Sequence, residues 1–217
     1  MDRRADVRDT YDRIATHFAS TREYAWPEVE SFLEDREGEV GLDLGCGNCR
    51  HAESLAPHAD RVLGVDVSRG LLETGRTRAT DRDFSVDLIQ GDASRLPLAA
   101  DVVDVAVYVA TLHHLPTRET RVASLEELAR VLTPGGRALV SAWSTAHDKF
   151  DQEKGFDTTV EWTLPGGEKV DRFYHIYSPE EFEADLEESA LEVIDWEISS
   201  GNCYAEVTAE EKGNSLK

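Results

Sequence analysis

The chain has 217 residues, enough for one domain with a full hydrophobic core, and its 40% hydrophobic content excludes a disordered protein. No apolar run reaches the ~20 residues of a membrane span, and no apolar stretch follows the charged opening residues. We therefore expect a cytoplasmic protein without a signal peptide, whose formal net charge of −21 disfavours a nucleic-acid substrate in ordinary salt.

The charge arises from 44 acidic residues against 23 basic ones, and it has two interpretations. One is an ordinary solvated acidic surface. The other, which we favour, is a cytoplasm at molar salt, as in haloarchaea, where screening weakens the repulsion between carboxylates. At that salt concentration the objection to a nucleic-acid substrate loses most of its force.

Apolar runs of strand length alternate with amphipathic stretches, which predicts an α/β domain with a mostly parallel, doubly wound sheet. We expect strands at residues 40–44, 61–66, 86–90, 103–109, 136–142, 191–198 and 202–208. We expect helices at residues 6–18, 26–36, 48–56, 68–79, 118–132 and 178–189, with Ser68 as a cap and Thr133-Pro134-Gly135-Gly136 as a helix end. The domain covers 1–209, with an irregular insertion or lid at 144–172 and a disordered tail at 210–217.

The first predicted strand ends in Gly45-Cys46-Gly47, a loop in which glycine permits a sharp turn and a close approach to a ligand. By itself such a loop is as consistent with NAD as with any other nucleotide-type cofactor. Cys46 and Cys49 form a C-x-x-C pair, but the second pair of a zinc ribbon is absent, so we disfavour zinc or redox chemistry.

Three acidic residues, each at or near the end of one of the first three strands, narrow the choice of cofactor. Asp43 precedes the loop and is suited to a methionine amino group, whereas it would repel a pyrophosphate. Asp66 ends the second strand, where it can accept hydrogen bonds from ribose hydroxyls, and Asp92 follows the third, beside the expected adenine. Singly, each could be a helix cap or turn former. Their shared position at the carboxyl edge favours S-adenosylmethionine.

These residues resemble those of class I methyltransferases, and Leu132-Thr133-Pro134-Gly135-Gly136 is another mark of that class. The resemblance implies a seven-stranded Rossmann-like sheet with an antiparallel last strand. Cys49 departs from it, because the family usually has glycine there. We expect Cys49 to adopt a negative φ in a slightly tighter loop.

The fourth strand leads into His113-His114, beside the expected transferable methyl group. A structural role for one or both rings is an open alternative, and metal binding is disfavoured because no third ligand stands at a suitable spacing. Arg118 and Arg121 lie on one helical face, where they could bind substrate or simply pair with surface glutamates.

A more specific resemblance favours the substrate interpretation. His-His-Leu-Pro-Thr-Arg-Glu-Thr-Arg at 113–121 is similar to a segment of the tRNA wobble-uridine carboxyl methyltransferases, which esterify 5-carboxymethyluridine. Residues 11–27, 172–177 and 201–204 also resemble segments of that family. Thr120 and Cys203 depart from its pattern.

This resemblance implies a set of substrate-side residues: His113, His114, Arg118, Arg121, Arg172, Tyr174 and His175. The resemblance also adds Tyr11 and Arg22 to the cofactor site. The predicted cofactor set is then Tyr11, Arg22, Asp43, Gly45, Cys46, Gly47, Asp66, Val67, Gly91, Asp92, Ala93 and Val109. Trp26, Tyr174 and His175 are candidates to stack on a flipped uracil, with core packing as the alternative.

The resemblance also implies a heterodimer with a small zinc-binding activator protein and a tRNA anticodon as substrate, without DNA or membrane. Because a carboxylate is ionised at neutral pH, its methylation needs positioning rather than a strong base. We expect Arg118 or Arg121 to hold flanking phosphate and a histidine to contact the carboxylate. Two rival functions are a small-molecule methyltransferase and a non-catalytic cofactor-binding scaffold.

Overall fold

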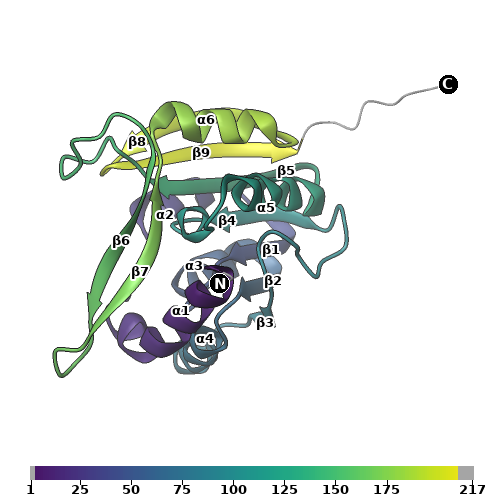
Figure 1. Cartoon of the computed structure of the whole chain (residues 1–217). Helices are drawn as coiled ribbons and strands as arrows, with labels where there is room; N and C mark the ends of the chain where they lie inside the picture. Colours follow the sequence, from purple (N-terminus) through teal and green to yellow (C-terminus); the bar gives the residue numbers. More distant parts are fainter. Residues whose placement is uncertain (1–2, 210–217) are drawn as a thin grey trace.

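The computed structural model describes residues 3–209 and confirms the predicted α/β sheet (Figure 1). The sheet strands are β1 (Gly38–Leu44), β2 (Ala59–Asp66), β3 (Asp87–Gln90), β4 (Val103–Tyr108), β5 (Leu132–Trp143), β8 (Leu191–Ser199) and β9 (Asn202–Ala209). Their order is β3-β2-β1-β4-β5-β9-β8, and the first five are parallel. The last strand, β9, is antiparallel to both of its neighbours, as expected.

Six helices within the described residues cover the two faces of this sheet: α1 (Arg3–Ser20), α2 (Pro27–Leu33), α3 (Arg50–Leu55), α4 (Arg69–Arg82), α5 (Arg118–Val131) and α6 (Pro179–Glu188). Helices α5 and α6 pack on one face through Leu125, Leu128 and Phe182. Helices α2 and α3 pack on the other, where Leu33 and Leu55 are fully buried. Two short 3₁₀ turns complete the elements, η1 (Ala56–His58) and η2 (Leu112–His114).

The helix starts follow from their capping residues. The Ser68 hydroxyl accepts a hydrogen bond from the Leu71 backbone N–H, so the predicted cap of α4 is confirmed. Thr117 and Thr120 form a reciprocal capping box at the start of α5. Ser178 caps α6, whose first residue is Pro179.

The prediction of an irregular segment at 144–172 is wrong for its second half. Strands β6 (Phe156–Thr163) and β7 (Lys169–Ile176) form an antiparallel hairpin. Two glycines with positive φ, Gly166 and Gly167, lie between them. A polar residue, Thr158, and a charged one, Arg172, occupy inward-facing positions of the hairpin, so the apolar alternation that predicts a strand is interrupted. The predicted tail at 210–217 lies outside the described residues.

The hairpin lies beside the carboxyl edge of the sheet and runs from the region of α6 to that of α1 (Figure 1). It packs against α1 at one end, where Trp162 and Val170 join Tyr11 and Ile14 in a small apolar cluster. The hairpin thereby provides one wall of the space above the strand ends.

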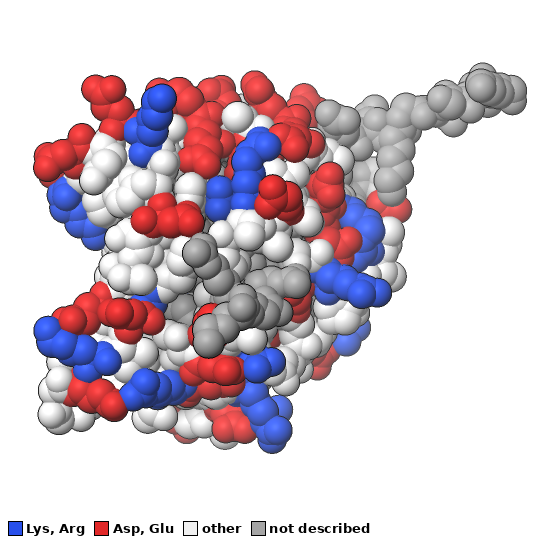
Figure 2. All heavy atoms as spheres, viewed as in Figure 1, with Lys and Arg blue, Asp and Glu red and all other residues white. Residues whose placement is uncertain are grey.

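Acidic side chains are spread over the visible face and gather along the edge formed by α6 (Figure 2). No helix in the described part of the chain is long and apolar enough to cross a membrane.

Candidate functional site

A cavity with about 1210 Å³ of empty space, open to solvent, lies at the carboxyl edge of the sheet. Its floor is the loop after β1 and the ends of β2 and β4, and Arg172 and Tyr174 of β7 line its wall. In a parallel sheet this edge is where ligands bind, because the connecting loops separate there.

The glycine loop shows why small residues are required. Gly45 has a φ of +74°, and a side chain there would overlap Thr111. Gly47 has a φ of +52°, and a Cβ there would meet only the ring edge of Phe18, at 4.0 Å. The loop therefore presents bare backbone to the cavity, as close approach of a ligand requires.

Cys49 lies at the start of α3 with a φ of +63°, so the expectation of a negative φ is wrong. Cys49 thus adopts the left-handed conformation that favours glycine, at a cost of about 1 kcal/mol. The thiol is fully buried, and a Cβ on Gly75 of α4 would come within 2.5 Å of its Sγ. The glycine in α4 thus makes room for the cysteine in the loop.

We expect Gly75→Ala to lower the free energy of unfolding by about 1–3 kcal/mol, because the added methyl group overlaps the thiol. Cys49→Gly should change it by no more than about 1 kcal/mol, since relief of backbone strain offsets a small void. The double variant should recover most of the loss, and urea unfolding measures all three. A double variant as unstable as Gly75→Ala alone would contradict this coupling.

Asp43 does not line the cavity, which corrects its assignment to the cofactor amino group. The side chain is buried beneath the loop and accepts a hydrogen bond from the Ala52 backbone N–H at 2.9 Å. It therefore fixes the first turn of α3 to the loop. Burial raises the pKa of Asp43 to about 7.

Asp66 and Asp92 do line the cavity. Asp66 accepts hydrogen bonds from the backbone N–H groups of Gly47, at 2.9 Å, and Ser68, at 2.8 Å, which ties the loop to the end of β2. Burial raises the pKa of Asp66 to about 6. Asp92 accepts from the backbone N–H and the hydroxyl of Ser94, at 2.8 and 2.7 Å.

We expect the affinity for S-adenosylhomocysteine to fall about tenfold as the pH falls from 7 to 5. Asp66 is ionised above its pKa of about 6, and protonation below that value weakens it as an acceptor for ribose hydroxyls. Calorimetric titration at several pH values measures the effect. Asp66→Asn should bind more weakly and without this pH dependence, whereas Asp43→Asn should retain it. A constant wild-type affinity would contradict the role of Asp66.

The other half of the cavity is aromatic. His113 stacks on Tyr174 with centroids 4.9 Å apart, and His114 meets Tyr174 edge-on at 4.4 Å. Trp143, at the end of β5, packs against Tyr174 at 4.8 Å. Burial lowers the pKa of His114 to about 3 and that of His113 well below its ordinary value, so both rings are neutral at physiological pH.

Arg172 is the cationic group of this half. Its guanidinium carbon lies 4.8 Å from the centroid of the Trp162 ring and 5.1 Å from that of Tyr174. The residue is 5% exposed, and its Nε has no hydrogen-bond partner among the described residues. A buried, incompletely satisfied guanidinium beside a cavity is suited to an anionic ligand.

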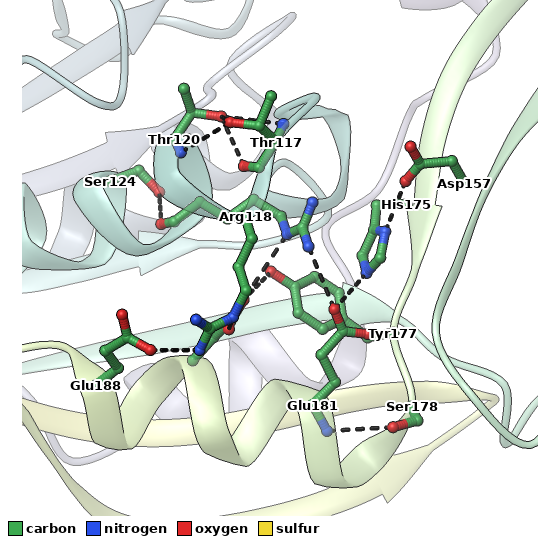
Figure 3. Close-up of polar contacts among 12 residues, drawn as sticks. Thr117, Arg118, Thr120, Ser124, Asp157, His175, Tyr177, Ser178, Glu181 and Glu188 are labelled. Atoms are coloured by element: carbon green, nitrogen blue, oxygen red, sulfur yellow. Dashed lines mark hydrogen bonds and ion pairs between the residues drawn. The ribbon is translucent and has the colours of Figure 1, made fainter.

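Three predicted substrate residues lie elsewhere: Arg118, Arg121 and His175 do not line the cavity. They belong to an ion-pair cluster between α5, α6 and the hairpin, termed the α5–α6 cluster (Figure 3). Arg118 contacts Asp185 at 2.7 Å and Glu188 at 2.5 Å. The structure therefore places both arginines outside the cavity, where they pair with acidic side chains of α6.

His175 belongs to the same cluster because it points to the opposite side of β7 from Tyr174. Its Nδ1 lies 2.8 Å from an Asp157 carboxylate oxygen, and its Nε2 lies 3.0 Å from one of Glu181 (Figure 3). Successive residues of a strand face opposite ways, so only Arg172 and Tyr174 of the predicted β7 trio reach the cavity.

The remaining predicted cofactor residues all line the cavity: Tyr11, Arg22, Gly45, Cys46, Gly47, Asp66, Val67, Gly91, Asp92, Ala93 and Val109. Sequence reasoning missed further lining residues, among them Asn48, Arg50, His51, Thr111 and Trp143. Trp143 is the last residue of β5, so the strand-end rule that found Asp66 would have found it. Asn48 holds the segment after α1, donating to the Arg22 carbonyl at 2.8 Å.

Comparison with known proteins decides the family. Residues 42–140 match the methyltransferase domain family. A relative from Schizosaccharomyces pombe, named tRNA (carboxymethyluridine(34)-5-O)-methyltransferase, is 31% identical over 165 residues, covering 73% of this chain and 68% of the relative. The chain belongs to this tRNA methyltransferase family. A relative from Encephalitozoon cuniculi, named as a methyltransferase, is 32% identical over 204 residues, with 90% and 91% coverage.

Other members of the family are longer than this chain. The Saccharomyces cerevisiae relative of the same name is 35% identical over 167 residues, which are 73% of this chain and 57% of the relative. The matched region spans only 40% of the Arabidopsis thaliana relative. The similarity therefore covers the methyltransferase domain of larger proteins.

Solved structures confirm the fold. The [4+2]-cyclase SpnF has a TM-score of 0.71 at 18% identity, covering 94% of this chain and 95% of that one. A chain in the complex of the Haloferax volcanii Trm112 methyltransferase activator with a methyltransferase has a TM-score of 0.68 at 17% identity, covering 94% and 97%. At these identities the likeness concerns the fold alone.

Proposed function

We propose that the chain is an S-adenosylmethionine-dependent methyltransferase that esterifies the carboxymethyl group of a modified wobble uridine in tRNA. The observation that carries the substrate side is Arg172, a buried guanidinium with an unpartnered Nε that lines the cavity. It lines the same cavity as the glycine loop and the Asp66 carboxylate, which suit a nucleoside with a methionine moiety. Family membership supports both halves of the proposal.

The chemistry needs little besides placement. The acceptor carboxylate is already ionised at neutral pH, and the cofactor, when bound, supplies an electrophilic methyl group. Arg172 would bind one carboxylate oxygen and leave the other free to attack. No proton has to be removed from the carboxylate, so the reaction needs no general base. The two neutral histidines, whose pKa values are lowered by burial, can therefore serve to position the acceptor. The ester has no charge, so it would lose the ion pair with Arg172, which favours product release.

The base itself would stack on the aromatic side chains around Trp143 and Tyr174, which are 4.8 Å apart. Lys149 lies over Trp143, with its Nζ 3.9 Å from the ring centroid, and is placed to meet a flanking phosphate. Lys149 thus replaces Arg118 and Arg121 as the candidate for phosphate binding.

The proposal is tested by deleting the chain from its host and analysing wobble uridines by mass spectrometry. The ester should disappear and the free carboxymethyl nucleoside should accumulate. An unchanged nucleoside profile would overturn the tRNA substrate and leave a small-molecule acceptor. Absence of S-adenosylhomocysteine binding would overturn the enzymatic proposal itself and favour a scaffold.

We further propose that the chain acts in the cytoplasm at molar salt, as a heterodimer with a small zinc-binding activator. The net charge of −21 supports the first point, and the fold shared with a chain crystallised beside the Trm112 activator supports the second. Purified alone, the chain should bind cofactor poorly, and co-expression with the activator should restore binding. Full activity of the lone chain in molar KCl would contradict a required partner.

A further inference from the structure

His113 and His114 are adjacent in η2, both line the cavity, and their ring centroids lie 4.4 Å apart. Because both are neutral, each ring carries one N–H donor and one acceptor nitrogen. Their hydrogen-bond partners fix which nitrogen carries the proton, and the two rings differ.

His114 has both nitrogens engaged by the protein. Its Nδ1 lies 3.0 Å from the backbone carbonyl oxygen of Phe173, which can only accept, so Nδ1 carries the hydrogen. Its Nε2 is then the acceptor and receives the Tyr11 hydroxyl, at 2.8 Å. His114 thereby ties α1 to β7 and has no donor left for a substrate.

His113 has the opposite tautomer. The backbone N–H of Trp143 donates to its Nδ1 at 3.2 Å, so the hydrogen resides on Nε2. No described residue forms a hydrogen bond with this Nε2–H. Stacking on Tyr174, with an interplanar angle of 15°, holds the ring in place. The residue is 1% exposed yet lines the cavity. Packing by neighbouring side chains therefore fixes the orientation of the Nε2–H donor.

We propose that His113 is the histidine that touches the methyl acceptor, donating its Nε2–H to it, and that His114 is a positioning residue held by Phe173 and Tyr11. This inference rests on the proposed function. A neutral donor would orient the acceptor without withdrawing as much electron density as a second cation. With Arg172, which lies beside the same Tyr174 ring, it gives the acceptor one charged and one neutral contact.

The tautomers are tested without activity, by long-range ¹H–¹⁵N NMR of the histidine rings. We expect the Nε2–H pattern for His113 and the Nδ1–H pattern for His114, with both unchanged between pH 6 and 8. His113→Phe and His114→Phe identify the signals by their loss. The reverse pattern, or two imidazolium rings, would overturn the assignment.

The roles are tested by methyl transfer to tRNA carrying 5-carboxymethyluridine. His113→Phe should lower kcat/KM by about 10- to 100-fold with unchanged S-adenosylhomocysteine affinity, as expected for one lost hydrogen bond to a charged group. His113→Gln, whose amide offers an N–H at a similar reach, should recover part of the loss. His114→Gln should lower the melting temperature and change kcat/KM by less than tenfold.

Wild-type activity in His113→Phe, or a loss in His114→Gln exceeding that in His113→Phe, would overturn the proposed division of roles. A wild-type protein that methylates no tRNA would instead overturn the proposed function, while the NMR result would still decide the tautomers.

Discussion

Replacing Arg172 with methionine should lower kcat/KM for tRNA carrying 5-carboxymethyluridine by about 10²- to 10³-fold and leave S-adenosylhomocysteine affinity unchanged. Truncating one partner of a buried charge pair costs about 2–5 kcal/mol, and each 1.4 kcal/mol is a factor of ten in rate. Methionine keeps much of the apolar contact of the side chain with Trp162 and Tyr174. The loss should therefore reflect the missing charge rather than a collapsed cavity.

Two controls sharpen this experiment. Arg172→Lys keeps the charge but loses the planar fork, and we expect it to recover only part of the activity. Lys169→Met removes a cation from the same strand, where Lys169 is exposed and pairs with Glu161, and it should have no effect on transfer. Equal losses in Arg172→Met and Lys169→Met would indicate a general electrostatic effect and contradict a direct contact of Arg172 with substrate.

The cofactor half of the site was predictable because one rule of topology governs it. Parallel strands end at a common edge, so Asp66, Asp92 and the glycine loop meet in space although they are far apart in sequence. Asp43 shows the limit of the rule. It lies one residue inside the end of β1, and its side chain points beneath the loop to the Ala52 N–H rather than into the cavity.

The substrate half was less predictable because its residues come from a hairpin and from helix faces. Alternation along β7 separates Tyr174 from His175, but the buried Arg172 interrupts the apolar pattern that would predict this strand. Helical spacing placed Arg118 and Arg121 together correctly, but it could not say that α6 would cover them with carboxylates. A family motif gives the identity of a residue and does not by itself distinguish a ligand of the substrate from a support of the fold.

Arg121→Met should lower the free energy of unfolding by about 1–3 kcal/mol, because Glu181 and Asp185 lose a buried cation while His175 and Arg118 remain beside them. The Arg121 side chain is 4% exposed, and it approaches Glu181 at 3.3 Å and the fully buried Asp185 at 3.8 Å. Its guanidinium also lies 5.1 Å from the centre of the Tyr177 ring. Urea unfolding at fixed KCl concentration measures the loss.

The double variant Arg121→Met/Asp185→Asn should recover part of this stability, because the amide carries no charge. The amide oxygen can still accept the hydrogen bond that the Tyr177 hydroxyl donates to Asp185 at 3.0 Å in the wild-type protein. Added salt should restore little, since the pair is shielded from solvent.

The folded fraction of Arg121→Met should keep its kcat/KM within about tenfold, because α5 presents this arginine to α6 and not to the cavity. A stable Arg121→Met variant that has lost methyl transfer would contradict this and return Arg121 to the substrate site. The comparison with Arg172→Met therefore separates two buried arginines that the family motif treats alike: one stabilises the α5–α6 cluster, and the other faces the acceptor.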